Sequence, residues 1–371
     1  MSYKPLRFSG NHQVDFIKTL RSRVNGYFES NKISKYGNVH MVIKTIAMLA
    51  MYIIPYLLMI VGVITNVWAI LAMWIVMGIA MAGIGFSIMH DANHGAYSKN
   101  KKVNKYLGYL INIVGGSAIN WKIQHNVLHH TYTNIDGMDE DIDPGKLMRL
   151  SPHKKRYMLH RIQHIYGWGL YGLMTFLWIT TKDFRQLFRY KNMGLTKSQN
   201  INTQVQLFRL IIAKILYYAV FLALPIAVLN INWWLVLIFF IAMHFTAGLI
   251  LGCVFQPAHV MPTADFPLPD KEGNLENDWA VHQLYTTTNF SPNSRLLGWY
   301  VGGLNYQIEH HLFPTICHIH YRKIAGIVKQ TAEEFGLPYH SQPNFLQAIL
   351  NHARMLRDLG KYDVAPVKTY V

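Results

Sequence analysis

Four long apolar blocks constrain the fold of this chain more than any other feature of its sequence. Each block is about 20 residues or longer, the length that a helix needs to cross the ~30 Å hydrocarbon layer of a bilayer. Only Lys44 and Lys214 carry a formal charge within them, and both lie near block ends, where a long side chain can reach the membrane surface. The sequence therefore predicts four membrane-spanning helices, at residues 42–64, 67–89, 210–229 and 233–255.

The connectors between the blocks predict two helical hairpins. Residues 65–66 join the first pair of blocks and residues 230–232 join the second pair, which leaves room only for tight turns. Neither connector contains Lys or Arg, whereas the segments at the other ends of the blocks are rich in both. By the positive-inside rule, we expect both termini and the long middle segment, residues 90–209, to lie in the cytoplasm.

The charge and the cysteines indicate the partners and the compartment. A net charge of +16 is compatible with nucleic acid binding, but the excess lies next to membrane segments, where anionic lipid is the favoured counter-charge. We therefore expect a lipid bilayer as partner and no nucleic acid. The two cysteines, Cys253 and Cys317, form no disulfide framework and agree with a reducing cytosolic face.

The sequence predicts three regions. Residues 1–40 interleave apolar residues with Lys18, Arg21 and Arg23, which indicates an amphipathic cytoplasmic helix on the membrane surface or on the cytoplasmic domain. They lack the apolar core of a cleavable signal peptide. The main domain is expected at residues 41–359, and residues 360–371 are expected to form a C-terminal tail.

Three short clusters of histidines lie at predicted membrane boundaries, all on one side. They are His90 and His94, then His125, His129 and His130, then Gln307, His310 and His311. On a helix, side chains three or four positions apart share a face and can converge on one point. Imidazole is the commonest metal ligand in proteins, and seven histidines are more than one ion normally takes. The clusters therefore predict two metal ions.

The ligand type narrows the choice of metal. Nitrogen ligands without thiolates argue against structural zinc of the cysteine type and favour iron, although copper and catalytic zinc remain open on ligand type alone. An acidic run with Asp139, Asp141 and Asp143 follows the second cluster. Pro144 and Leu150 stand where a calcium loop needs glycine and glutamate, so we expect a solvated loop or acceptors for imidazole N–H groups.

The clusters, their order and the two hairpins resemble the membrane fatty acid desaturase family over roughly residues 40–325. Residues 305–314, which read NYQIEHHLFP, carry the most specific part of this resemblance. Gln307, in place of a histidine, is similar to the front-end branch, which inserts a double bond between an existing one and the carboxyl end. Residues 121–134 are similar to bacterial acyl desaturases.

The resemblance implies a fold, a reaction and a ligand set. The fold would be an all-α integral membrane protein, with four transmembrane helices in two hairpins and a helical cytoplasmic cap that holds a di-iron site. Two iron ions would activate O2 to insert a cis double bond into a long-chain acyl group, linked to CoA or to a lipid. The implied metal ligands are His90, His94, His125, His129, His130, His259, Gln307, His310 and His311.

Histidines outside the clusters have other expected roles. His259 matches the position, at the cytoplasmic end of the fourth span, from which the family draws a further ligand. His282 is a rival for that position, but we expect it to support a ligand or to pack. His244, in the middle of the fourth block, is expected to be hydrogen-bonded to a neighbouring helix, with a role in a substrate channel as the alternative.

The electron donor and two alternative functions remain open. Many front-end desaturases carry a fused cytochrome b5 with a His-Pro-Gly-Gly motif, which this sequence lacks. A separate donor, ferredoxin or cytochrome b5 with its reductase, is therefore expected, and an acidic one would suit the basic surface. A membrane di-iron hydroxylase or related oxidase has the same ligand spacing. A metal transporter is disfavoured because the predicted spans hold almost no polar ligands.

Overall fold

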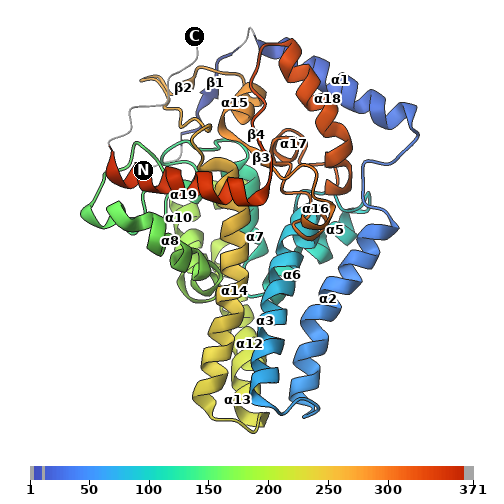
Figure 1. The fold of residues 1–371 in the computed structure, drawn as a ribbon, viewed down its shortest axis with the longest axis vertical. Helices are drawn as coiled ribbons and strands as arrows, with labels where there is room; N and C mark the ends of the chain where they lie inside the picture. The colour runs from blue at the N-terminus through green and yellow to red at the C-terminus, as the bar shows by residue number, and fades with distance from the viewer. Residues whose placement is uncertain (1–3, 11–12, 363–371) are drawn as a thin grey trace.

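The computed structural model describes residues 4–10 and 13–362. Parts of two predicted regions lie outside the described residues: positions 1–3 and 11–12 of the N-terminal segment, and positions 363–371 of the C-terminal tail. The described chain forms a narrow helical stalk beneath a broad helical cap (Figure 1). The predicted all-α fold is confirmed, since its strands are only two residues long.

The stalk contains four helices that are long and apolar enough to cross a membrane, and no others occur among the described residues. The first hairpin is α2 (Val39–Ile60) and α3 (Val67–Ile84), and α3 continues through a π-helical turn, Gly85–Met89, into α4 (His90–Asn93). The second hairpin is α12 (Thr203–Tyr218), which continues through Ala219–Ala223 into α13 (Leu224–Val228), and α14 (Trp233–His259). The four predicted spans are thus confirmed, with shifted ends.

The shifted ends matter for the histidines. The apolar blocks stop at the first polar residue, but helical hydrogen bonding continues, so His90 and His259 lie within the last turns of membrane helices and not beyond them. At the far end of the first hairpin, Asn66 caps α3 by accepting hydrogen bonds from the N–H groups of Trp68 and Ala69.

The two hairpins pack through α3 and α14. Gly78 allows the close approach, because a Cβ atom at this position would lie 2.5 Å from the carbonyl oxygen of Met243 on α14. The buried residues Trp74, Met77 and Phe240 fill the same contact. The cap ends of the two hairpins, where α4 carries His90 and α14 carries His259, are thereby held next to each other.

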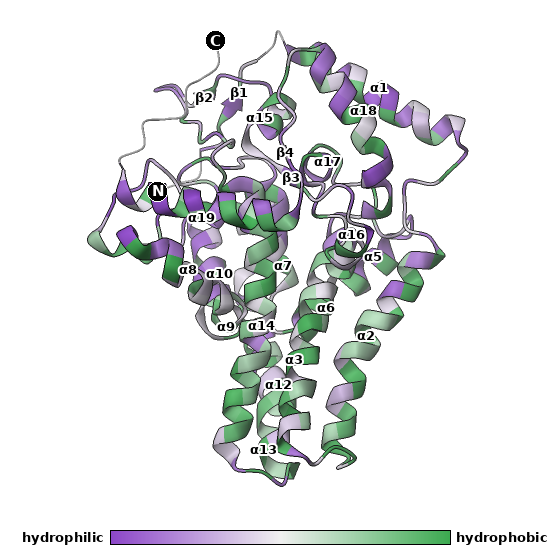
Figure 2. Ribbon diagram, viewed as in Figure 1, coloured by the Kyte–Doolittle hydropathy of each residue, from purple (hydrophilic) through white to green (hydrophobic). Residues whose placement is uncertain are grey.

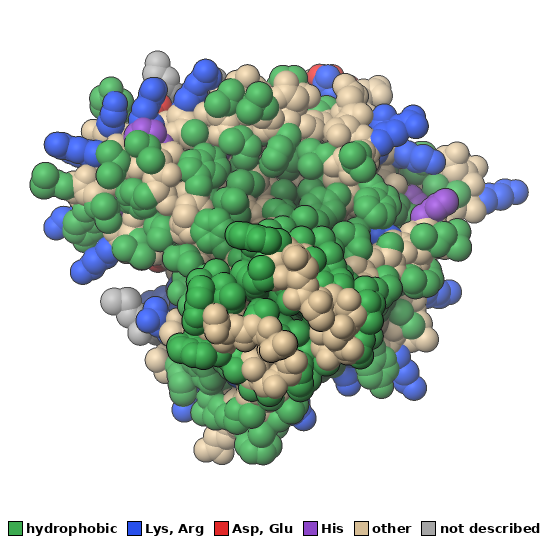
Figure 3. Space-filling model, turned by 60° about the horizontal axis from the view of Figure 1, so that its bottom comes forward, with side chains coloured by type: hydrophobic (Ala, Val, Ile, Leu, Met, Phe, Trp, Pro, Cys, Tyr) green, Lys and Arg blue, Asp and Glu red, His purple; other side chains and the backbone are tan. Residues whose placement is uncertain are grey.

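The outer face of the stalk is apolar. Large hydrophobic side chains such as Ile46, Ile54 and Trp68 are exposed, as a lipid-facing surface requires. Figure 2 shows the hydrophobic stalk, and Figure 3 shows its hydrophobic end surrounded by Lys and Arg side chains at the edge of the cap. The protein is an integral membrane protein.

The cap consists of short helices and two small parallel strand pairs. Its helices are α1 (Val14–Ser30), α5 (Lys101–Gly108), α6 (Leu110–Ile113), α7 (Ala118–Lys122), α8 (Gln163–Gly172), α9 (Met174–Leu177), α10 (Asp183–Asn192), α11 (Leu195–Ser198), α15 (Trp279–Thr286), α16 (Arg295–Tyr300), α17 (Gln307–Leu312), α18 (Tyr321–Glu334) and α19 (Phe345–Lys361). The strands are β1 (Arg7–Phe8) with β2 (Asn274–Leu275), and β3 (Asn289–Phe290) with β4 (Ser341–Gln342). Both pairs tie distant parts of the chain together.

The amphipathic N-terminal helix lies on the cap. α1 packs against α18 and buries Phe16, Leu20 and Val24. Of the two placements predicted for it, the membrane surface and the domain outside the spans, packing on that domain is the one observed. α1 thereby covers the core under α15, α17 and α18, which carries the third histidine cluster.

Candidate metal centre

The second histidine cluster lies in a widened helix. Residues Ile123–His129 are π-helical, so each backbone N–H bonds to the carbonyl five residues earlier, and residues five apart come to one side. His130 accordingly donates its backbone N–H to the carbonyl of His125 over 3.0 Å. The Nε2 atoms of these two histidines are 3.2 Å apart. The π-helical turn therefore aims both rings at one point.

The eight predicted histidines gather in two adjacent groups. In the first group, one ring nitrogen from each of His90, His94, His125 and His310 lies within 4.8 Å of the others. In the second group, the ring nitrogens of His129, His259 and His311 do the same. His130 joins the groups, because its Nε2 lies 2.9 Å from that of His310 and its ring also neighbours His311. Only His94 is partly exposed.

The residues present fit bound metal ions. Burial, followed by the charge of neighbouring histidines, lowers the pKa of His125, His130 and His310 well below the ordinary value, so these rings are neutral. The Nε2 atoms of His94, His259 and His311 are buried without a hydrogen-bond partner. Buried polar atoms without partners are costly, and a cation between converging lone pairs would satisfy them.

Hydrogen bonds to the far side of the rings leave Nε2 free for a metal. His311 donates from Nδ1 to Oε1 of Gln283 over 2.8 Å, and His259 donates from Nδ1 to the carbonyl of Thr286 over 3.2 Å. His310 Nδ1 lies 3.2 Å from the hydroxyl of Tyr321. Such outer bonds fix the orientation of each ring, as is usual for metal-binding histidines.

Asp139 holds His129 in the same way. Its carboxylate is buried and lies 3.1 Å from Nδ1 of His129. Of the two roles expected for the acidic run, a solvated loop or acceptors for imidazole N–H groups, Asp139 therefore has the second. Asp141 is 3.4 Å from the same nitrogen. Burial disfavours the charged ring, but the two carboxylates outweigh it and raise the pKa of His129 to about 9. Metal binding through His129 would therefore release a proton.

Three further residues of the sequence analysis have defined places. Gln307 is buried at the start of α17, and its Nε2 has no hydrogen-bond partner; its role as a ligand stays a prediction. His282 lies 2.9 Å from the carbonyl of Thr133 and outside the two groups, which agrees with a packing role. His244 contacts Tyr217 and Thr175 on neighbouring elements, which agrees with the predicted structural role.

Sequence reasoning missed several supporting residues. Trp279 donates its indole N–H to the carbonyl of His130, and nothing in the sequence around either residue predicts this bond. Glu309 stands within the third cluster, and its position there was the available signal. It is buried and accepts hydrogen bonds from Asn289 and Tyr339, and burial raises its pKa to about 7. These contacts brace the α17 helix.

An apolar hollow lies beside the first group of histidines. Its wall includes Met89 of the turn before His90, and Trp121, whose ring centre is 4.4 Å from that of His125. The other lining residues are Met81, Gly85, Ile111, Val114, Thr175, Trp178, Leu251 and Phe255. The hollow has a volume of only about 20 Å³, so a hydrocarbon chain would enter it only if these side chains moved apart; there it would be in a dry environment next to the metal-binding rings.

A larger groove opens on the other side of α9. Its volume is about 550 Å³, and Leu170, Leu173, Met174 and Leu177 give it an apolar wall. Its rim carries basic side chains, Lys182, Arg185 and Arg189, and acidic ones that include Asp141. Met174 and Leu177 line the groove, while Thr175 and Trp178 line the hollow, so the same short segment separates the two spaces.

Comparison with known proteins decides the family. The family model described as fatty acid desaturase matches residues 66–343, which is most of the chain. The chain belongs to the fatty acid desaturase family. This desaturase is therefore an oxidoreductase that acts on fatty acyl chains, and its buried histidine groups fit a metal site.

Individual relatives extend over nearly the whole desaturase. The sn-1 linoleoyl-lipid 6-desaturase of Arthrospira platensis is 38% identical over 349 residues, which are 94% of this chain and 93% of that protein. A protein of the same name from Synechocystis sp. is 36% identical, over 93% of this chain and 96% of that protein. The acyl-lipid (8-3)-desaturase of Physcomitrium patens is 36% identical over 96% of this chain and 74% of its own.

Proposed function

We propose that this desaturase binds two iron ions and uses O2 to insert a cis double bond into a long-chain acyl group. The observation that carries the proposal is the pair of adjacent, buried histidine groups beside an apolar hollow. When bound, iron supplies the oxidising power to remove hydrogen from an unactivated methylene, which no side chain supplies by acid–base or nucleophilic chemistry. The protein binds the ions, positions the chain and excludes water.

The proposed ligands are the residues of the three clusters together with His259. They are His90, His94, His125, His129, His130, His259, Gln307, His310 and His311. The two groups of converging ring nitrogens support the assignment of the histidines. Gln307 is assigned by its position in the third cluster, three residues before His310 on α17, where its amide oxygen would face the ion directly or through a water molecule.

The proposed substrate is an acyl chain linked to a membrane lipid. Two relatives are named for a linoleoyl lipid and a third for an acyl lipid. A new bond at carbon 6 of a linoleoyl chain lies on the carboxyl side of the existing double bonds, so these names favour front-end regioselectivity. Acyl-CoA remains the alternative carrier, since the basic rim of the groove suits its phosphates also.

The groove and the hollow together form the proposed path of the acyl chain. The carrier would lie at the basic rim around Lys182, Arg185 and Arg189, and the acyl chain would pass along α9 toward Trp121. Apolar walls hold a flexible chain without directional bonds, so its depth in the hollow would set the position of the new double bond. This placement brings a methylene to the first histidine group.

The remaining parts of the proposal concern the surroundings of the site. The cap, both termini and the metal centre would lie in the cytoplasm, because Lys and Arg flank the stalk at the cap end. Electrons would come from a separate acidic carrier, ferredoxin or cytochrome b5 with its reductase. Residues 41–359 would form the desaturase domain.

Product analysis tests the proposal. Cells that express the full chain are fed saturated, mono-unsaturated and di-unsaturated fatty acids, and gas chromatography–mass spectrometry locates any new double bond. We expect a bond on the carboxyl side of an existing one, together with two iron ions per purified chain. A hydroxylated product, or no product from iron-loaded protein supplied with reduced donor, would contradict it. A bond elsewhere in the chain would contradict the front-end assignment alone.

A further inference from the structure

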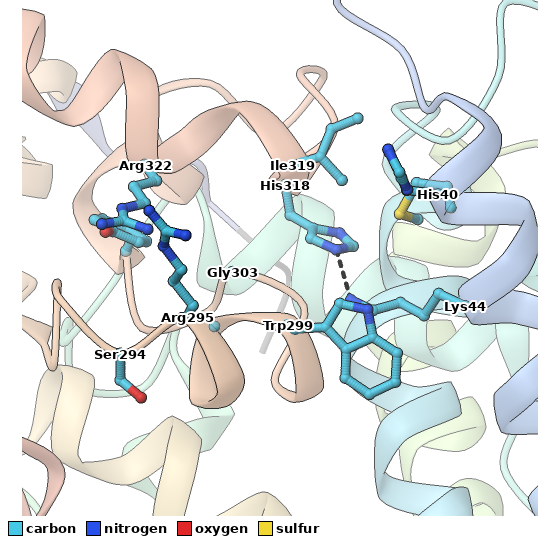
Figure 4. A pocket seen from close by; sticks show the side chains of 12 residues that line it. His40, Lys44, Ser294, Arg295, Trp299, Gly303, His318, Ile319 and Arg322 are labelled. Carbon is cyan, nitrogen blue, oxygen red and sulfur yellow. Dashed lines mark hydrogen bonds between the residues drawn. The ribbon is translucent and has the colours of Figure 1, made fainter.

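A basic pocket lies apart from the metal centre, between the beginning of α2, α16 and the beginning of α18. Its volume is about 230 Å³. Figure 4 shows Arg295 and Arg322 on one side of this pocket and Lys44 and His40 on the other. None of the residues that line it is an aspartate or glutamate. The pocket is therefore an anion-binding environment without an anion from the protein.

The two arginines of the pocket have no partner among the described residues. Neither Arg295 nor Arg322 forms an ion pair or hydrogen bond with another described residue, although both face the same space. Proteins usually separate or pair such charges, because like charges repel. Two neighbouring guanidinium groups match the oxygens of one phosphate, which accepts parallel hydrogen bonds from each fork.

Lys44 adds a buried charge to this arrangement. Its side chain is only 2% exposed, and its Nζ lies 2.9 Å from Nε2 of His318. His318 donates from Nδ1 to Asp91 over 2.8 Å, so its Nε2 accepts one ammonium proton. The other protons of Lys44 have no acceptor among the described residues, and the ammonium lies 5.2 Å from the ring of Trp299. The carboxylate of Asp91 acts on Lys44 only from behind His318, so the side of the ammonium that faces the pocket is left for an anion from outside.

The depth of the pocket indicates where that anion comes from. On α16, Leu296 is 79% exposed and Trp299 is 45% exposed. The neighbouring start of α2 exposes Val42 and Ile43, which belong to a membrane span. Exposed tryptophan beside lipid-facing residues is typical of the headgroup level of a bilayer. The basic groups therefore stand where lipid phosphates lie.

We propose that this pocket binds the phosphate group of one anionic membrane lipid. Arg295 and Arg322 of the cap would bind the phosphate oxygens, and Lys44 of α2 would add a third positive charge. The acyl chains of the lipid would lie along α2 beside Trp299. The lipid would join the cap to the first hairpin at a point distinct from the groove and hollow proposed for the substrate. The site is independent of the reaction that the enzyme catalyses.

Lipid retention tests the site directly. The full-length, iron-loaded protein is delipidated in detergent and titrated with phosphatidylglycerol, and native mass spectrometry counts the lipids bound. We expect one tightly held phosphatidylglycerol, and an affinity lower by about tenfold or more in R295Q/R322Q, because two charge-assisted contacts are lost. The matched control is R354Q/R357Q, which removes two exposed arginines of α19 and should leave the affinity unchanged.

Three comparisons complete the test. Phosphatidylglycerol should raise the midpoint of thermal unfolding of the unchanged protein more than that of R295Q/R322Q, since a ligand stabilises the state that binds it. Equal retention by R295Q/R322Q and by the unchanged protein would overturn the proposal. Equal binding of zwitterionic phosphatidylcholine would overturn the requirement for an anionic lipid. Equally tight binding of sn-glycerol 3-phosphate would overturn the lipid as source and leave a site for soluble phosphate esters.

Discussion

Trp279 donates its indole N–H to the main-chain carbonyl of His130 over 2.9 Å, although the two residues are 149 positions apart in the chain. The bond joins the first turn of α15 to the end of the second histidine cluster. The carbonyl of His130 takes no hydrogen bond within the π-helical segment that precedes it, and Trp279 supplies one. The bond also limits how far His130 can turn away from His310.

Replacement of Trp279 by phenylalanine tests this connection. The variant keeps an aromatic ring but leaves the His130 carbonyl without its donor, so we expect activity to fall on the order of tenfold, as for other outer supports of metal ligands. The free energy of unfolding should fall by about 1 kcal/mol. The measurements are turnover with chemically reduced donor and thermal unfolding. Trp233→Phe, at the exposed start of α14, is the control and should change neither.

Removal of a proposed ligand should abolish activity without preventing membrane insertion. We expect this of His129→Ala and of His310→Ala, because each takes one nitrogen from a buried group that has no substitute nearby. Product formation, iron content and the membrane fraction are measured together. His164→Ala is a matched control, since His164 stands four residues after His160 but lies outside both groups. Full activity in His310→Ala would refute the ligand assignment.

Asp139→Asn tests the support of His129. The amide keeps the size of the carboxylate but removes its charge, so we expect iron affinity to fall roughly 10- to 100-fold. Iron retained after dialysis against a graded chelator gives the affinity. Asp143→Asn is the control in the same loop, because Asp143 pairs with Lys154 and does not contact a histidine of the centre. Similar iron loss in both variants would show that the loop as a whole, and not the carboxylate of Asp139, matters.

The hollow can be narrowed by one methyl group. A Cβ atom at Gly85 would meet only a methyl carbon of Leu251, at 3.5 Å, which is an ordinary contact, so Gly85→Ala should fold normally. We expect kcat/KM for the longest accepted acyl chain to fall by about tenfold, since a methylene-sized misfit is worth 1–3 kcal/mol. Gly26→Ala, on α1 with open space around it, is the control. Unchanged kinetics with Gly85→Ala would place the acyl chain elsewhere.

The stability of the protein should depend on His352 at acid pH. Burial, partly offset by the hydrogen bond from its Nδ1 to the carbonyl of Val260, lowers the pKa of His352 from 6.5 to about 4. Above pH 6.5 the ring is neutral whether the chain is folded or unfolded, and the full stability is present. Between pH 6.5 and 4 the unfolded chain takes up a proton that the folded protein does not, so stability is lost, by on the order of 3 kcal/mol.

His352→Gln separates this contribution from that of the other buried histidines. Glutamine can donate to Val260 and accept from Tyr171 without titrating. We therefore expect the variant to lose less stability than the unchanged protein when thermal unfolding is followed from pH 7 to pH 4.5. Parallel pH curves for the two proteins would rule out His352 as a source of acid sensitivity.

The sequence predicted the parts of this protein that depend on local pattern. The length of an apolar block sets whether a helix can span a bilayer, so all four spans were predicted, and only their ends moved by a few residues. The spacing of histidines along a helix likewise indicated three ligand clusters. The π-helical turns at Gly85–Met89 and Ile123–His129 were not predicted, because an extra residue in a turn leaves the apolar pattern almost unchanged.

Only the tertiary structure decided which residues meet. The sequence assigned His259 to the metal only through the family resemblance, with His282 as its rival, and it left two roles open for His244. Packing brings His259 to His129 and His311, while it turns His282 to a backbone carbonyl and His244 to Tyr217. The sequence left the bond from Asp139 to His129 as one of two alternatives, and it did not predict the bonds of Gln283 and Trp279 to the histidines of the centre. The length of a membrane helix and the spacing of a histidine cluster depend on residues close together in the chain, so a sequence pattern predicts them. Contacts between distant segments depend on how the helices pack, and no periodicity along the chain predicts that packing.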